Sequence, residues 1–155
     1  MTKLEHLREE NELTKKQISQ ILNVSNSIYT RWENGKEFIP TKRMFQLANF
    51  YKVNIDYLLG LSSNRIKIFT EGDINISLVS KRVREIRKYF NETLRVFAKR
   101  LNTSNSTWSA YEMGKVLILG AFLLEICKMD NYSIDWILGR TNIKYRIDIK
   151  EKQPS

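Results

Sequence analysis

Cysteine and histidine, which often build catalytic and metal sites, each occur only once in this chain. A lone cysteine, Cys127, excludes an intrachain disulfide and a thiolate metal cluster. His6 lies on a predicted helix with no nucleophile or second ligand beside it. The sequence also contains no glycine-rich phosphate loop and no cluster of metal-ligating side chains. We therefore expect no enzymatic activity and no cofactor or metal site, and no small-molecule ligand is evident.

Long apolar runs are also missing. The most hydrophobic stretch, residues 116–124, is far shorter than the roughly 20 residues that a membrane-spanning helix requires. The first residues include Lys3 and Glu5 and contain no apolar signal core. Together with the single cysteine, these absences lead us to expect a cytoplasmic protein without a membrane partner.

Acidic residues are outnumbered, with 17 Asp and Glu against 26 Lys and Arg, so the net charge is +9. Such an excess suits an anionic partner such as nucleic acid or a membrane surface, although a soluble protein can also simply be basic. The charge is uneven: residues 1–64 hold 9 basic and 7 acidic side chains, and residues 65–155 hold 17 and 10. Charge alone would therefore make the second half the better polyanion binder.

The most informative feature present is an internal repeat. Ser25-Asn26-Ser27, Glu33 and Gly35-Lys36 recur 79 residues later as Ser104-Asn105-Ser106, Glu112 and Gly114-Lys115. The register holds without a gap from Leu7/Ile86 to Ser63/Asn142. The sequence therefore predicts two copies of one domain of about sixty residues, a size that can fold alone around a modest core.

Local signals predict five helices in each copy. In the first copy a helix over about 2–11 precedes Thr14, a natural N-cap with Gln17 at the capping-box position. Asn23 ends the second helix because asparagine tolerates the left-handed conformation of a tight turn. Ser25 caps the third helix, and Gly35 ends it. A fourth helix begins at 40–41, and a fifth covers about 55–59.

Two short helices joined by a tight turn form a helix-turn-helix, and residues 2–60 resemble the lambda repressor/Cro family of such domains. The resemblance is carried by Thr14, Ile18, Asn23-Val24-Ser25, Tyr29, Trp32-Glu33-Asn34-Gly35-Lys36 and Asp56-Tyr57-Leu58-Leu59-Gly60. It implies an all-α fold of two tandem five-helix domains, DNA binding through the third helix, and dimeric control of transcription. The expected domains are 1–64 and 79–142, separated by a linker (65–78) and followed by a tail (143–155).

The linker and the tail show a different periodicity. Residues 65–69 and 74–78 alternate apolar and polar side chains around a turn-like tetrad, and residues 143–149 alternate again. This pattern favours a β-hairpin in the linker and a strand in the tail. An extended linker and a frayed tail explain it equally well.

A recognition helix presents its N-terminal residues to base edges in the major groove. We expect the outward positions of residues 26–33 to read bases, namely Asn26, Ser27, Thr30 and Arg31. Asparagine can bond adenine bidentately and arginine can bond guanine in the same way. The resemblance places phosphate contacts at the start of the second helix and in the loop after the third, namely Thr14, Lys15, Gln17, Lys36, Thr41 and Lys42.

The second copy keeps the frame but loses several of these residues. Ala110 replaces Arg31, and apolar Leu94 and Val96 replace Lys15 and Gln17. The remaining candidates for DNA contact are Arg95, Asn105, Ser106 and Lys115. Large apolar side chains in excess of what a small core requires predict a dimer interface, formed by Leu117, Leu119, Phe122, Met129 and Trp136. The rival arrangement is an internal pseudo-dimer of the two copies.

Arg8/Arg87 and Glu33/Glu112 are identical between the copies although none is expected to read a base. We predict two structural ion pairs, Arg8–Glu33 and Arg87–Glu112.

The sequence therefore predicts a homodimeric regulator of transcription, a repressor, that reads double-stranded DNA with its first domain. The alternative is a protein-interaction module, antitoxin-like or anti-repressor-like, that keeps the fold and binds a protein.

Overall fold

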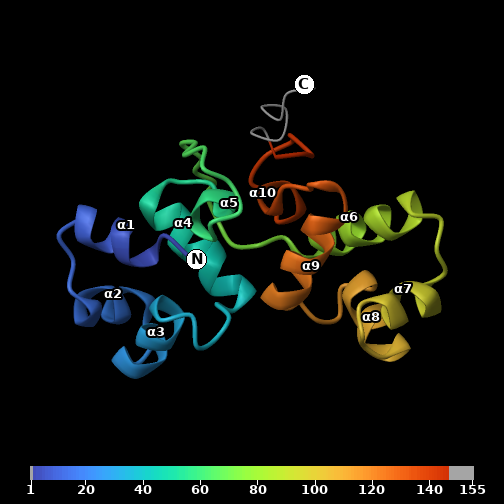
Figure 1. Ribbon diagram of the computed structural model, residues 1–155, viewed down its shortest axis with the longest axis horizontal. Helices are drawn as coiled ribbons and strands as arrows, with labels where there is room; N and C mark the ends of the chain where they lie inside the picture. Colours follow the sequence, from blue (N-terminus) through green and yellow to red (C-terminus); the bar gives the residue numbers. More distant parts are fainter. Residues whose placement is uncertain (1, 147–155) are drawn as a thin grey trace, which may run out of the picture. The chain divides into compact units, whose positions relative to one another are not determined.

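Every regular element in the computed structural model, which describes residues 2–146, is a helix (Figure 1). The first five are α1 (Leu4–Glu10), α2 (Lys15–Leu22), α3 (Asn26–Glu33), α4 (Thr41–Tyr51) and α5 (Ile55–Leu58). The next five are α6 (Ile76–Tyr89), α7 (Leu94–Arg100), α8 (Asn105–Glu112), α9 (Gly120–Asp130) and α10 (Ile134–Ile137). None of these helices is long and apolar enough to cross a membrane.

The chain divides into two compact units. The first unit extends to Thr70 and contains α1 to α5, whereas the second covers Glu71–Tyr145 and contains α6 to α10. In the first unit α2 packs on α3 and α4 on α5, around a core that includes Leu7, Ile18, Tyr29 and Leu47. The second unit pairs α7 with α8, and α6 with both α8 and α10.

The helices of the two units follow the same register. The bounds of α8, α9 and α10 are those of α3, α4 and α5 displaced by 79 residues. Left-handed backbone conformations recur at the same displacement, at Glu12/Asn91, Asn23/Asn102, Gly35/Gly114, Lys52/Asn131 and Gly60/Gly139. Since such conformations mark the ends of helices and tight turns, the turns as well as the helices are shared.

The first helix of the second unit begins earlier than its sequence pattern suggests. α6 has 14 residues where α1 has 7, and its N-cap is Asn75, whose side chain accepts a hydrogen bond from the Leu78 backbone N–H. The prediction of a strand over residues 74–78 is therefore wrong. Buried Val79, Val83 and Ile86 form one helical stripe, and the capped turn at Asn75 extends that helix by two further turns.

The remaining extended segments dock individually instead of pairing as strands. In the first unit Asn54 donates its backbone N–H to the Ile66 carbonyl (3.0 Å), and its side-chain oxygen accepts the Ile66 N–H (2.8 Å). In the second unit Ser133 donates its N–H to the Lys144 carbonyl (2.9 Å), and a single bridge joins Tyr132 to Tyr145. The predicted hairpin is absent from the described residues, and residues 147–149 of the predicted tail strand lie outside them.

A cluster of aromatic rings surrounds the Lys144 ammonium at the end of the second unit. Its Nζ lies 5.4–5.9 Å from the ring centroids of Tyr89, Tyr132, Trp136 and Tyr145. It also lies 3.0 Å from a carboxylate oxygen of Glu85. A cation over several ring faces is attracted by each of them, so Lys144 anchors this segment to α6 and α10.

Candidate nucleic-acid interface

Helices α2 and α3 are set by side-chain caps and a left-handed turn. The Thr14 hydroxyl accepts the Gln17 backbone N–H (3.1 Å), and the Gln17 side chain accepts the Thr14 N–H (2.8 Å), which completes the predicted capping box. Asn23 ends α2 with a φ of 56°, and the Ser25 hydroxyl accepts the Ile28 N–H at the start of α3. This geometry is a helix-turn-helix whose second helix begins at Asn26.

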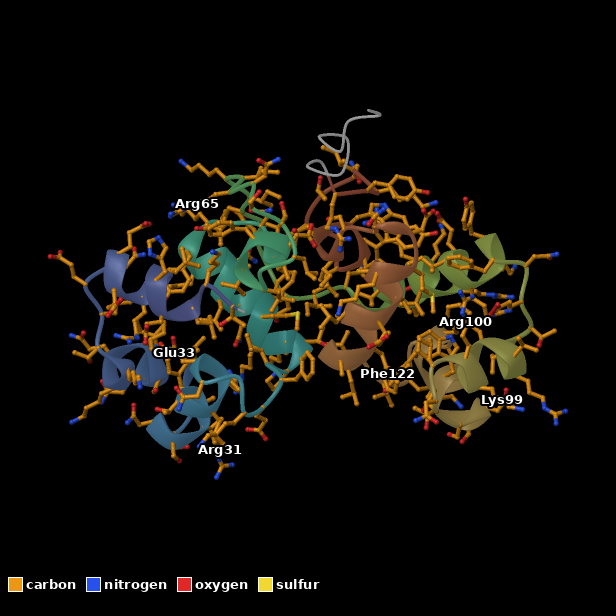
Figure 2. The ribbon with its side chains drawn as sticks, in the orientation of Figure 1. Arg31, Glu33, Arg65, Lys99, Arg100 and Phe122 are labelled. Carbon is orange, nitrogen blue, oxygen red and sulfur yellow. The ribbon has the colours of Figure 1, made fainter. Side chains whose placement is uncertain are left out.

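Helix α3 has a buried side and an exposed side. Tyr29 and Trp32 are buried, whereas Asn26, Ser27 and Arg31 are exposed. Figure 2 shows the Arg31 side chain extending away from the helix. Asn26, Ser27 and Arg31 therefore form a polar row that a partner can contact, and the apolar side chain of Ile28 is exposed on the same helix.

Thr30, the fourth candidate for base reading, is less accessible to a partner than the other three. Its side chain is half-buried, and its hydroxyl donates to the carbonyl oxygen of Asn26 (2.7 Å).

Most of the predicted phosphate contacts lie on the surface. Thr14, Gln17, Lys36 and Lys42 are exposed and Lys15 is half-buried. Thr41 departs from the prediction, since it is only 5% exposed. As the first residue of α4 it follows exposed Pro40, and the side chain is buried in the first unit. We therefore remove its side chain from the candidate phosphate contacts.

The end of α3 is tied to α1 by an ion pair. The Arg8 guanidinium donates through Nε and Nη2 to the two carboxylate oxygens of Glu33, at 2.6 and 3.2 Å. Its Nη1 donates to the Leu13 carbonyl at the turn before α2 (3.0 Å). One guanidinium thus connects α1, the α1–α2 turn and α3, which fixes the helix that carries the polar row.

Burial shapes the ionisation of this pair and of its neighbour Tyr29. Burial disfavours the charged form of Glu33, but the hydrogen bonds and charge of Arg8, together with Tyr29 and Lys15, outweigh it and lower the pKa of the carboxyl group below its ordinary value. The Glu33 carboxylate in turn raises the pKa of Arg8. Burial and the nearby Glu33 raise the pKa of the Tyr29 phenol. Both members of the ion pair are therefore charged at neutral pH.

The second predicted ion pair is also present. Arg87 donates through Nε and Nη2 to the Glu112 carboxylate at 2.6 and 2.9 Å, and through Nη1 to the Glu92 carbonyl at 2.8 Å. The buried Trp108 indole N–H, at the position of Tyr29, donates to the same carboxylate (2.9 Å). The network thus occupies the same register in both units.

The second unit differs at the surface. Arg95, Asn105, Ser106 and Lys115 are exposed, as contact with DNA would require. Ala110, however, stands in the position of Arg31. The polar row of α8 therefore lacks the cation that α3 presents.

Four of the five residues predicted for the dimer interface are at least partly exposed. Leu119 is 56% exposed, whereas Leu117, Phe122 and Met129 are half-buried. Phe122 packs against the rings of Trp108 and Tyr111, with centroids 5.9 and 5.8 Å away.

Trp136 departs from the dimer prediction, since it is only 6% exposed. Its ring is covered by the Arg82 guanidinium at 4.9 Å, stacks on Tyr132 at 6.2 Å and faces Lys144. All three neighbours belong to the second unit. Trp136 is therefore part of the packing of its own unit and leaves the predicted dimer surface.

Met113 and Val116 are among the exposed apolar side chains that the sequence analysis did not identify. Met113 and Val116 are 63% and 51% exposed, in the segment between α8 and α9. Their counterparts in the first unit are the polar residues Asn34 and Glu37. A systematic comparison of the copies at the offset of 79 would have identified both, because only a surface position tolerates this exchange without a change in the core.

Comparisons with known proteins agree with the geometry of the first unit. Residues 2–62 match the family model of a helix-turn-helix domain. A protein of Bacillus subtilis (strain 168), described as the uncharacterized HTH-type transcriptional regulator YobD, is 31% identical over 62 residues. The match covers 40% of this chain and 55% of that protein, so the chain spans about half the length of this curated relative. No solved structure matches the chain.

Fold and family match together identify residues 2–62 as a helix-turn-helix domain.

Proposed function

We propose that this protein is a non-enzymatic regulator of transcription that binds double-stranded DNA sequence-specifically and acts as a repressor. The observation that carries the proposal is the polar row of α3, in which Asn26, Ser27 and Arg31 are exposed on the second helix of a helix-turn-helix. Asparagine and arginine are the side chains best suited to bidentate contacts with adenine and guanine. The similarity to an HTH-type transcriptional regulator supports the same class of function.

In this proposal, one set of residues positions the protein on the DNA and another set reads the base sequence. Lys15, Lys36 and Lys42 neutralise phosphates on either side of the groove, while the N-terminus of α2 offers free backbone N–H groups to a phosphate oxygen. Such contacts set the orientation of α3 without reading sequence. Repression then follows from occupancy, because a protein bound over a promoter excludes the transcription machinery.

The repeat supports a further part of the proposal, that both units are copies of one domain and that the protein acts as a homodimer. The second copy has lost the arginine of the recognition helix, so we assign base reading to the first copy and assembly to the second. Two first units in one dimer read an inverted repeat, since operator symmetry mirrors protein symmetry.

Selection of binding sites from random duplex DNA, followed by two single substitutions, tests the proposal. Arg31→Ala should weaken binding to the selected operator by about 1–3 kcal/mol and relax the preference at one base position. Lys36→Ala should weaken operator and random DNA alike and reduce the salt slope of binding by about one. Failure to recover any preferred sequence would refute sequence-specific reading. Equal weakening of all sequences by Arg31→Ala would make Arg31 a phosphate contact.

A reporter gene placed behind the selected operator tests the sign of regulation. Expression should fall when the protein is supplied and recover with Arg31→Ala. A rise in expression would identify an activator instead.

A further inference from the structure

Four exposed positions of the first unit carry large apolar side chains in the second. Gln17, Asn34, Glu37 and Pro40 are exposed in the first unit. Their counterparts at the offset of 79 are Val96, Met113, Val116 and Leu119, which are 52%, 63%, 51% and 56% exposed. At three of these positions a polar side chain of the first unit has become an apolar one, and at the fourth Leu119 replaces Pro40; all four positions lie outside the cores.

These four positions belong to the elements that carry the proposed DNA contacts in the first unit. Val96 lies in the first turn of α7, the counterpart of α2, and the other three lie between the end of α8 and the start of α9. Between them, the outward side of α8 carries Asn105, Ser106, Ser109 and Ala110, all small or neutral. We call this surface, made of Val96, the outward side of α8, Met113, Val116 and Leu119, the apolar α8 face.

The residues of this face suit DNA less well than those of the first unit, where Arg31 and Lys15 stand in place of Ala110 and Leu94. Phosphate contacts need cations or hydrogen-bond donors, and α8 contains one charged residue, Glu112, which is held in the ion pair with Arg87. In the segment that follows, Lys115 is the charged residue before α9. Several large apolar side chains exposed on one surface are typical of a face that another protein covers.

We propose that the apolar α8 face packs against the same face of a second copy of this chain. Two identical chains of net charge +9 repel each other over most of their surface. This repulsion is smallest where the chains meet through uncharged side chains, and Val96, Met113, Val116 and Leu119 are uncharged, with Arg95 and Lys115 at neighbouring positions. In a two-fold symmetric interface the same patch meets itself, so a neutral apolar patch is complementary to its own copy. The small side chains of Ser109 and Ala110 let the two α8 helices approach closely.

This inference rests on the proposed function, which takes the first unit as the part that reads DNA and the second as the part that assembles a homodimer. It adds that the second unit has exchanged its DNA-facing surface for an assembly surface, so that assembly and DNA contact by that unit exclude each other. It also places the dimer contact on α7, α8 and the α8–α9 segment, and not around Trp136.

Exchanging residues between the copies tests the proposal. The full-length triple variant Val96→Gln, Met113→Asn, Val116→Glu gives the second unit the residues of the first. Sedimentation velocity without DNA, over a range of concentrations, should show a dimer for the unmodified chain. For the triple variant the dissociation constant of the dimer should rise at least about a hundredfold. Since all three side chains are more than half exposed, the helical circular dichroism signal should be unchanged.

The matched control removes apolar surface from the first unit instead. Phe38 and Phe50 are 57% and 43% exposed, and the double variant Phe38→Ser, Phe50→Ser should leave the dimer intact. A monomeric unmodified chain, a dimeric triple variant, or equal dissociation by both variants would each overturn the proposal. Because the measurement contains no DNA, its result is independent of whether Arg31 reads bases.

Discussion

At the scale of single residues, two ion pairs of the first unit have similar lengths and different surroundings. The shortest contacts are 2.6 Å in Arg8–Glu33 and 2.5 Å in Arg65–Glu10. The Glu33 side chain is 1% exposed and the Arg8 side chain 11%, whereas both side chains of the second pair are 40% exposed. Water and salt screen an exposed pair, while a buried charge that loses its partner keeps its full desolvation cost.

We therefore expect mutation of the two pairs to lower the free energy of unfolding by very different amounts. Arg8→Ala should lower the free energy of unfolding by about 3–5 kcal/mol, because it leaves the Glu33 carboxylate buried without a counter-charge. The control Arg65→Ala should cost no more than about 1 kcal/mol. Urea unfolding followed by circular dichroism measures both. Similar losses for the two variants would show that Glu33 is solvated or protonated once its partner is removed.

At the scale of elements, the segment after α10 shows how an irregular stretch is held in place. Residues around Lys144 have little regular structure, yet the backbone of Lys144 accepts a hydrogen bond from Ser133 and its side chain reaches four aromatic rings. The equivalent segment of the first unit is held at Asn54, the position that corresponds to Ser133. In both units, therefore, the chain that leaves the last helix is fastened beside that helix.

Removal of the ammonium tests the importance of this anchor. Lys144→Ala should destabilise the second unit by about 1–2 kcal/mol through the loss of cation–π contacts and of the pair with Glu85. The control Lys81→Ala, at an exposed position inside α6, should be nearly neutral because alanine is a good helix former. Thermal unfolding monitored by tryptophan fluorescence measures both, since Trp136 lies in the cluster. If the two variants melt alike, the rings around Lys144 contribute nothing to stability.

At the scale of the whole molecule, charge and proposed function point to opposite halves of the chain. The excess of basic residues lies mainly after residue 64, whereas the proposed recognition helix lies before it. Total charge raises the general attraction to a polyanion, but the salt dependence of a specific complex counts the phosphates that are actually contacted. The two contributions can therefore be separated by experiment.

Lys36 and Lys115 provide a matched pair for this purpose, because they occupy the same position in the two copies and both are exposed. Lys36→Ala should lower the slope of log affinity against log salt by about one, and Lys115→Ala should leave that slope unchanged. Titration of a labelled operator at several salt concentrations gives both slopes. A reduced slope for Lys115→Ala would place the second unit on the DNA and contradict the assignment of assembly to it.

Much of the local structure could be predicted because its causes are local. Thr14 with Gln17, Asn23 and Ser25 specify caps and a turn through their own backbone neighbours, so α2 and α3 begin and end where the sequence indicates. The ion pairs were also predictable, since the repeat preserves two charged residues that need not read bases. Residues close together in the chain, with the repeat, are thus enough to predict the helix order, the turn and the ion pair that holds α3.

Which side chains remain on the surface depends on how the helices pack, and local sequence signals do not show it. Thr41 and Trp136 read as contact residues in the sequence, but neighbouring elements cover both. Conversely, the exposure of Met113 and Val116 was not anticipated from the sequence. The alternation of apolar and polar side chains over residues 74–78 predicted a strand. Because Val79 and Val83 are buried on one side of a helix, residues 76–78 instead form the start of α6. Caps and turns depend on residues a few positions apart, and these can be read directly from a single sequence. Burial depends on residues that are distant in the chain and that only the fold brings together.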